Sequence, residues 1–283
     1  MIELTEIMRQ KDDQPFAQLL NRFRTAAQTK DDLEYIQSRT VSPALHIFAE
    51  NAPVDQHNNV HLECLSAPSH RLKATDHYPP NVTKQDIENV LTRGGSETGV
   101  LDFEILVKEN SRVMLTTNID INDRLIKGQM GTIKKIAKPS VIYIKQNGAV
   151  PTEPVLARIK VRPGKPSSPE IQRLQFSLTL TWACTVHKVQ GLTLNEIVVS
   201  FDLNRQTHFN YGQIYVALSR ATSLQGLHVI GHIKNKHVRA NPKVEAEYHR
   251  MRQMENTCSN SSTIDANLSL KICLLKYTFP EKT

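Results

Sequence analysis

Apolar residues at the start of the chain recur at the spacing of a helix. The positions that share this helical face are Phe16, Leu19, Leu20 and Phe23. Asp12 or Asp13 stands where a helix N-cap belongs, and Pro15 falls in the first turn. We therefore expect a first helix here, followed by a polar connection and a second short helix over residues 33–39.

The next apolar run, residues 44–49 (ALHIFA), is short and continuous, as in a buried strand. A turn and an expected helix over residues 54–65 follow it. A strand, a turn and a helix in this order are the building block of an α/β sheet. A further strand is predicted over residues 72–78, and residues 81–99 read as a helix and loop that lead out of the sheet domain.

The pattern changes at about residue 101. Three short β-type runs, residues 112–117, 131–136 and 141–144, are separated by glycine-containing turns, which predicts a small β-barrel inserted into the α/β domain. The lysines of this region could follow a phosphate backbone, or could keep the strand edges soluble and unpaired. They are Lys127, Lys134, Lys135, Lys138 and Lys145.

Residues 155–161 and 176–182 are predicted as strands that return the chain to the α/β domain. Thr185 is placed to cap a helix after the second strand, and its first turn carries three polar side chains. They are His187, Lys188 and Gln190. Amide groups at a helix N-terminus favour anions and Lys188 adds a full charge, so phosphate contacts are expected here.

A buried strand is expected over residues 196–201 and a helix over residues 211–221. The apolar face of this helix leaves Arg220 pointing away from the core. After a last strand at residues 227–230, the chain is basic and helix-like over residues 234–254, and residues 256–283 are expected to form a tail.

Composition narrows the class of protein without naming a function. The 283 residues carry a formal charge of +7, which favours a polyanionic partner. The four cysteines form no CxxC pair, so the sequence predicts no zinc site and a reducing compartment. No apolar run approaches the roughly 20 residues that cross a bilayer, and residues 1–13 lack a signal-peptide core. We expect no membrane partner and a nuclear protein, or a cytoplasmic one in a bacterium or virus.

Two further sequence patterns are missing from these 283 residues. The Gly164–Lys165 pair is followed by Pro166, so the chain holds no phosphate-binding GxxxxGK motif followed by Ser or Thr. An apolar strand ending in the Asp-Glu pair that would hold a magnesium ion is also missing.

Five segments in a fixed order resemble a known family. ACTVHKVQGLTL and YGQIYVALSRATSLQGL resemble the last two motifs of RecD-like superfamily 1B DNA helicases, and more narrowly of petite-integration-frequency (Pif-type) helicases, including those of Helitron transposons. RVMLTTNIDINDRLIKGQMGTI resembles their inserted β-barrel, and LTEIMRQKDDQPFAQLLNRFR and HIFAENAPVDQHN resemble the opening motifs of their second RecA-like domain. The resemblance covers about residues 4–231.

The resemblance implies a domain organisation. The first part of a RecA-like parallel-sheet domain would occupy residues 1–100, the inserted barrel residues 101–150, and the rest of the RecA-like domain residues 151–235. Residues 236–283 would form a C-terminal helix and a disordered tail.

The resemblance also implies roles for single residues. Arg9 would be an arginine finger that reaches the γ-phosphate of ATP, with Gln10 beside it, and Arg220 would be a second such arginine. A planar guanidinium suits this role because it offers paired donors to phosphate oxygens and keeps its charge near neutral pH. Loss of such a finger lowers the rate of phosphoryl transfer by about 10³ to 10⁵.

Five residues between the two arginines complete the implied site. Thr185, His187 and Lys188 would lie along a DNA single strand, and Gln190 and Gly191 would link the strand to the nucleotide.

Two departures from the family pattern bear on activity. Val189 stands where serine is usual, and the first RecA-like domain, which holds most of the residues that bind ATP and Mg²⁺, is missing from this sequence. We therefore expect the C-terminal portion of an ATP-dependent DNA helicase that is inactive as an isolated chain. The first alternative is a non-catalytic single-stranded DNA-binding module derived from a transposon helicase. A hydrolase using Ser219, His187 and Asp202 is a weaker alternative, because no GxSxG elbow is present.

Overall fold

The computed structural model describes eight stretches of the chain. They are residues 8–37, 44–91, 101–123, 125–137, 142–145, 149–162, 165–201 and 209–259. The chain divides into one compact unit of residues 6–240 and a second that contains residues 1–5 and 241–283. Each unit is described by itself.

A four-stranded parallel sheet lies at the centre of residues 6–240. Its strands are β12 (Ala183–Thr185), β1 (Leu45–Phe48), β13 (Ile197–Ser200) and β14 (Leu227–Ile230), in this spatial order. Along β1, Leu45 and Ile47 are buried on one face, and His46 and Phe48 are half-buried on the other. This two-sided burial is typical of a sheet covered by helices on both faces, and it confirms the predicted α/β class.

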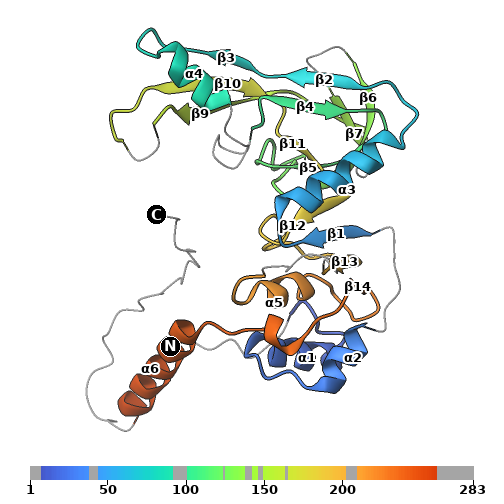
Figure 1. Cartoon of the computed structure of the whole chain (residues 1–283), viewed down its shortest axis with the longest axis vertical. Coiled ribbons are helices and arrows are strands. Elements are labelled where there is room, and N and C mark those ends of the chain that lie inside the picture. Colours follow the sequence, from blue (N-terminus) through green and yellow to red (C-terminus); the bar gives the residue numbers. More distant parts are fainter. Residues whose placement is uncertain are drawn as a thin grey trace. The chain divides into compact units, whose positions relative to one another are not determined.

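Helices cover both faces of the parallel sheet. The helices α1 (Gln14–Arg24), α2 (Lys30–Gln37) and α5 (Gln213–Leu218) lie on one side, and α3 (Asn51–Glu63) lies on the other (Figure 1). Asp13 caps α1, because its Oδ1 accepts the amide of Phe16 at 3.1 Å. The sequence left the choice between Asp12 and Asp13 open, and the structure selects Asp13.

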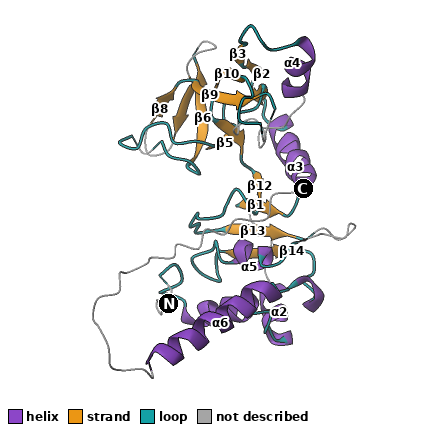
Figure 2. Cartoon of the chain, turned by 90° about the vertical axis from the view of Figure 1, so that its left-hand side faces the viewer, coloured by secondary structure: helices purple, strands orange, loops and turns teal. Residues whose placement is uncertain are grey.

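The region predicted as a small β-barrel contains antiparallel strands. Five of them form a sheet in the order β11, β5, β6, β7, β8. Their bounds are Leu178–Leu180, Arg112–Leu115, Met130–Ile136, Ile142–Lys145 and Ala149–Thr152. Figure 2 labels three of these strands, β5, β6 and β8. Among the described residues no ladder joins β8 to β11, so closure into a barrel stays a prediction. The strand β11 lies outside the predicted barrel boundaries of residues 101–150.

A two-stranded sheet of β2 (His70–Lys73) and β4 (Glu104–Val107) packs against these five strands. The two sheets share one apolar core, which includes Leu72, Val107, Leu115, Ile133, Ile144 and Phe176. Burial of this core holds the antiparallel region together in the same way that a sandwich of two sheets is held.

A third sheet joins β3 (Thr75–His77), β10 (Glu170–Gln175) and β9 (Val155–Lys160). The predicted strand over residues 72–78 is interrupted at Ala74, because β2 pairs with β4 whereas β3 pairs with β10. Inside this region the guanidinium of Arg173 pairs with Asp76 at 2.7 Å, and the two side chains are 0% and 2% exposed.

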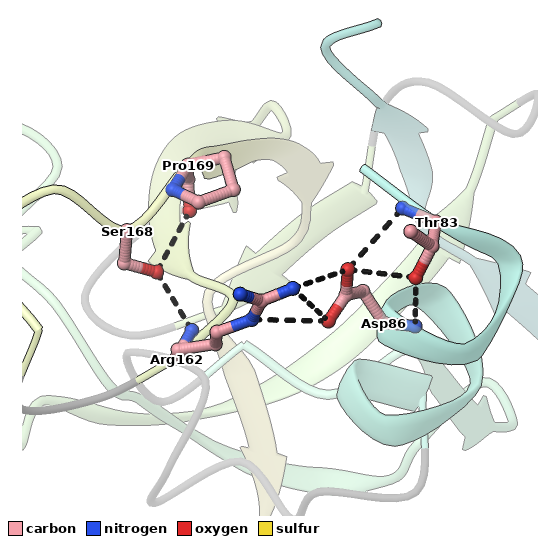
Figure 3. Close-up of polar contacts among 5 residues, drawn as sticks. All are labelled: Thr83, Asp86, Arg162, Ser168 and Pro169. Carbon is pink, nitrogen blue, oxygen red and sulfur yellow. Dashed lines mark hydrogen bonds and ion pairs between the residues drawn. The ribbon is translucent and has the colours of Figure 1, made fainter. Parts of the chain in front are cut away.

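Helix α4 (Lys84–Leu91) is fastened to the loop after β9 by the polar network in Figure 3. Thr83 and Asp86 cap the helix reciprocally, since each side chain accepts the backbone amide of the other. The guanidinium of Arg162 donates to both oxygens of Asp86, and the amide of Arg162 donates to Ser168 Oγ at 2.7 Å. The carboxylate of Asp86 therefore caps a helix and holds a loop at once.

The second unit contains the helix α6 (Pro242–Ser259). A helix was expected over residues 234–254, and the structure instead has a 3₁₀ turn at Asn235–His237 followed by α6. Pro242 explains the separation, because proline is tolerated in the first turn of a helix and not in its interior. Within the described ranges, no helix combines the length and the apolar character needed to cross a membrane.

Candidate functional site

Arg9 and Arg220 lie next to each other, although they are far apart in the sequence. Arg9 precedes α1, and its Nε donates to Thr193 Oγ1 at 3.0 Å while its Nη1 donates to the carbonyl of Ser219 at 3.2 Å. Ser219 is the residue before Arg220, and it follows the last turn of α5. The fold therefore brings the two predicted catalytic arginines to one place.

The guanidinium of Arg220 is anchored by three acceptors. Its Nε donates to the carbonyl of Val216 at 2.8 Å, its Nη1 to the carbonyl of Leu192 at 3.3 Å and its Nη2 to Ser219 Oγ at 2.9 Å. Arg220 is only 7% exposed. The expectation that it points away from the core is wrong, because α5 ends at Leu218 and Arg220 lies in the turn after it, where the carbonyls of Val216 and Leu192 hold its guanidinium.

The charge of Arg9 acts on the guanidinium of Arg220. Burial, and then the charge of Arg9, lower the pKa of Arg220 to about 10, an effect that Tyr215 partly opposes. Arg220 therefore stays protonated near neutral pH. Among the described residues, neither arginine makes an ion pair with a carboxylate. Two adjacent, anchored cations without an anionic partner form a site that favours an anion.

Gln10 holds the backbone on either side of Arg220. It is 4% exposed, and its Nε2 donates to the carbonyl of Ala221 at 2.7 Å and to that of Ser219 at 3.3 Å. These carbonyls flank Arg220 in the chain. The side-chain nitrogen of Gln10 therefore holds the segment that carries Arg220.

The segment after β12 differs from the prediction. A helix capped by Thr185 was expected, and the structure has a series of tight turns instead. The amides of Lys188, Gln190 and Leu192 donate to carbonyls three residues earlier, at 3.0, 3.3 and 3.0 Å. Gly191 has φ +88°, a conformation that interrupts a helix and favours glycine. Because no helix begins here, no helix N-terminus attracts an anion. The positive charge of Lys188 is the remaining attraction for phosphate.

The predicted DNA-contacting residues lie along these turns. His187 and Lys188 are exposed, and Thr185 is 6% exposed at the end of β12. His187 Nε2 lies 3.1 Å from Nε2, the side-chain amide nitrogen, of Gln213. An amide nitrogen only donates, so His187 Nε2 accepts and the ring is oriented by α5. Lys188 Nζ lies 3.5 Å from Thr179 Oγ1 and keeps its charge at the surface.

Only a few residues separate the predicted DNA-contacting residues from the groups that hold the arginines. Gln190 and Gly191 are exposed, and Leu192 and Thr193, which supply acceptors to the two arginines, follow them directly. All eight predicted site residues therefore lie at residues 9–10, at residues 185–191 or just after α5. The sequence reasoning missed Leu192 and Thr193, because their contribution depends on contacts that have no sequence pattern.

The hydrolase alternative finds no support in the geometry. Ser219 Oγ accepts from Arg220 Nη2 and donates to the carbonyl of Val216. His187 instead orients toward Gln213. Asp202 lies outside the described residues.

On the opposite face of the sheet, Asn58 of α3 fixes the start of β12. Its Oδ1 accepts the amides of Trp182 and Ala183 at 3.0 and 2.8 Å, and its Nδ2 donates to the carbonyl of Ala183 at 3.1 Å. Asn58 belongs to the HIFAENAPVDQHN segment, and the signal that could have identified it is its helical spacing of four residues from the apolar Val54 and Leu62.

A column of aromatic rings stands beside Asn58. The ring centroids of His46 and His57 are 4.3 Å apart, as are those of His57 and His61, and His61 stacks on Trp182 at 5.7 Å. Burial, and then the neighbouring His46 and His61, lower the pKa of His57 to about 4. This ring is therefore neutral near physiological pH.

The donor set at the arginine pair fits the phosphates of ATP. The guanidiniums of Arg9 and Arg220 present only N–H donors, which match phosphate oxygens and not a Mg²⁺ ion. In the part of the chain that the structure describes, no group of three or more His, Cys, Asp or Glu side chains is placed to hold a metal ion.

Comparison with known proteins points to one group of enzymes. No family model matches the chain. The ATP-dependent DNA helicase PIF1 of Xenopus laevis is 30% identical over 278 residues, which cover 93% of this chain and 40% of the relative. The human ATP-dependent DNA helicase PIF1 is 28% identical over 89% of this chain and 38% of its own length. The chain thus spans about two-fifths of the length of these relatives.

Solved structures with the same fold have a related description. The Pif1 helicase of Candida albicans has a TM-score of 0.67 and 22% identity, over 87% of this chain and 60% of that chain. A Bacteroides Pif1 bound to single-stranded DNA has a TM-score of 0.65 and 24% identity, over 90% of this chain and 57% of that one. At these identities the structures support the fold alone.

Proposed function

Because this chain belongs by homology to the Pif1 family of superfamily 1B DNA helicases, we propose that it forms part of an ATP-dependent DNA helicase. Within that enzyme it contributes two arginines that sense the phosphates of ATP and a surface that contacts single-stranded DNA. The observation that carries the proposal is the meeting of Arg9 and Arg220 over the carbonyl and hydroxyl of Ser219.

The nucleotide role follows from the geometry of the pair. Each guanidinium is held by neutral acceptors that leave its charge uncompensated, and N–H groups of both remain available for an anion. A phosphate group between them would supply the missing negative charge. When bound, ATP with Mg²⁺ supplies the phosphoryl group that is transferred to water; the arginines here bind and orient its phosphate oxygens.

The DNA role rests on the turn segment. Lys188 and His187 are exposed on it, with Thr185 at its start, and Gln190 and Gly191 lead from them to the acceptors of the arginine pair. A contact with a single strand at Lys188 is therefore only a few residues from Leu192 and Thr193, which accept hydrogen bonds from the two arginines. We propose that this short connection lets strand and nucleotide influence each other.

These 283 residues contain neither a GxxxxGK motif followed by Ser or Thr nor a strand ending in Asp-Glu. We propose that a first RecA-like domain binds the remainder of ATP and its Mg²⁺, and that this chain by itself does not hydrolyse ATP.

Binding of a fluorescent oligothymidine to the 283-residue chain tests the DNA role. We expect weak binding that falls steeply as salt rises from about 50 to about 200 mM, because phosphate contacts release counterions. Lys188→Ala should weaken binding and reduce the slope of log affinity against log salt by about 1. Lys84→Ala, which removes an exposed lysine from α4, is the matched control and should leave both unchanged. Binding that is insensitive to salt, or equal in the two variants, would contradict the proposal.

A further inference from the structure

Residues 192 and 193 supply one acceptor to each arginine of the pair. The carbonyl of Leu192 accepts from Arg220 Nη1 at 3.3 Å, and Thr193 Oγ1 accepts from Arg9 Nε at 3.0 Å. A shift of this dipeptide would therefore move an anchor of both guanidiniums. What holds the dipeptide in place is then relevant to the geometry of the site.

The side chain of Leu192 lies against a glycine of the antiparallel region. A Cβ atom at Gly128, in the loop between β5 and β6, would stand 2.5 Å from Leu192 Cδ2. Gly128 also has φ +87°, which disfavours any side chain. Leu192 thus packs directly on the backbone of this loop, and its own flank is partly buried on the core of the parallel sheet.

The loop of residues 116–129 has its own internal support in the stretches that the structure describes. The amide of Gly128 donates to the carbonyl of Leu115 at 2.8 Å, Asp120 and Leu125 form an antiparallel bridge, and the amide of Lys127 donates to Asn118 Oδ1 at 2.8 Å. These bonds tie the loop to β5. A movement of the five-stranded sheet would therefore reach Leu192 through a stiff element.

The same loop also presents side chains to solvent. Ile121 and Ile126 are 74% and 40% exposed, and Lys127 is exposed beside them. One part of the loop therefore faces solvent while Gly128 contacts Leu192. A stiff element that contacts solvent at one place and a functional site at another can transmit displacement between them.

We propose that Leu192 is a positioning residue that couples the 116–129 loop to Arg9 and Arg220 through its contact with Gly128. Displacement of the loop moves the 192–193 dipeptide, and the two guanidiniums change their spacing together. The functional consequence rests on the proposed phosphate-sensing role of the pair.

The test follows the Nε–Hε groups of the arginines by NMR in the full 283-residue chain, with and without pyrophosphate. Arg9→Lys and Arg220→Lys assign the two signals. Leu192→Ala is expected to shift both signals in the absence of ligand and to weaken pyrophosphate binding by about 2- to 30-fold. Thr193→Val, which removes only the hydroxyl that holds Arg9, should shift the Arg9 signal alone.

The contact is tested from the loop side by Gly128→Ala. This variant should shift the same two signals as Leu192→Ala, and in the double variant its effect should shrink, because truncation removes the methyl group that the new Cβ meets. Ile121→Ala, an apolar truncation at an exposed position of the same loop, should leave both signals in place.

Two results would overturn the coupling. One is a loss of thermal stability in Leu192→Ala with both arginine signals unchanged, which would make Leu192 a core residue only. The other is full additivity of Gly128→Ala and Leu192→Ala. If pyrophosphate fails to bind the wild-type chain, the phosphate-sensing role fails, and the ligand-free shifts still decide the coupling.

Discussion

Arg220 keeps a charge in a largely buried place, and no carboxylate among the described residues pairs with it. Burial of an ionised group costs free energy unless hydrogen bonds and an opposite charge compensate it. The three acceptors around Arg220 supply the hydrogen bonds, and Arg9 adds a like charge nearby. The missing compensation is what an incoming anion would provide, so the cost at this residue is consistent with a binding site.

The effect of the charge of Arg9 on the pKa of Arg220 can be measured directly. Arg9→Ala removes a positive charge and opens the site to water, and both changes should raise the pKa of Arg220 from its value of about 10. A titration of the arginine Cζ resonances at alkaline pH reports it. Arg22→Ala, at an arginine that pairs with Asp32, is the control and should not change the pKa of Arg220. An unchanged or lower pKa in Arg9→Ala would contradict the proximity of the two charges.

His57 predicts a dependence of stability on acid. Its pKa is about 4 in the folded chain and 6.5 in a free histidine, so the unfolded state binds the proton more readily. The free energy of unfolding should therefore fall as pH drops from about 6.5 to about 4. His46 and His61, whose rings contact that of His57, disfavour its protonation further.

Urea denaturation across this pH range measures the effect. His57→Phe should flatten the pH dependence, whereas His77→Phe, at an exposed position on β3, should leave it as in the wild type. Identical slopes in the wild type and His57→Phe would show that the ring column does not resist protonation.

At the residue scale, the sequence identified Arg9, Gln10 and Arg220 through motif resemblance, and the fold brings them together. It could not identify Leu192 and Thr193, because a backbone carbonyl and an exposed threonine carry no pattern that distinguishes them from their neighbours. The burial of Arg220 was also missed, because helical periodicity was extended past the point where α5 ends.

Among the elements, the amide side chain of Asn58 links α3 to the start of β12. Asn58 is 5% exposed and accepts two backbone amides at the start of β12. Asn58→Ala would leave the amides of Trp182 and Ala183 without this acceptor in a buried place. We expect the free energy of unfolding to fall by at least about 2 kcal/mol.

Asn59→Ala provides the matched control for that prediction. Asn59 is the next residue of α3 and is exposed, so its loss should change stability little. Equal urea midpoints for the two variants would contradict the role of Asn58 as the link between α3 and β12.

Elements with a strong apolar pattern were predicted correctly, and those set by tertiary contacts were not. The strands β1, β13 and β14 and the helix α1 follow the sequence pattern closely, whereas α3 begins at Asn51, three residues before its predicted start and where a turn was expected. The turns after Thr185 were mistaken for a helix, because a capping residue followed by polar residues is also compatible with successive turns. The division of residues 72–78 into β2 and β3 depends on two different partner strands, which no local pattern contains.

At the scale of the whole molecule, the unit of residues 6–240 combines a helix-covered parallel sheet with three antiparallel sheets. The α/β class and the presence of an antiparallel region were predictable from the change in periodicity near residue 101. The boundary was not, since β11 comes from residues 178–180 and joins strands much earlier in the chain. Long-range pairing of this kind follows from the shared apolar core and is invisible to a local reading.

A pyrophosphate titration of the full chain tests most directly whether Arg9 and Arg220 together form a phosphate-binding pair. We expect the Nε–Hε signals of these two arginines to shift along one saturable curve. Those of Arg22 and Arg173, which pair with Asp32 and Asp76, should stay in place. A titration in which all arginines shift alike, or in which Arg9 and Arg220 do not respond, would contradict the phosphate-binding role of the pair.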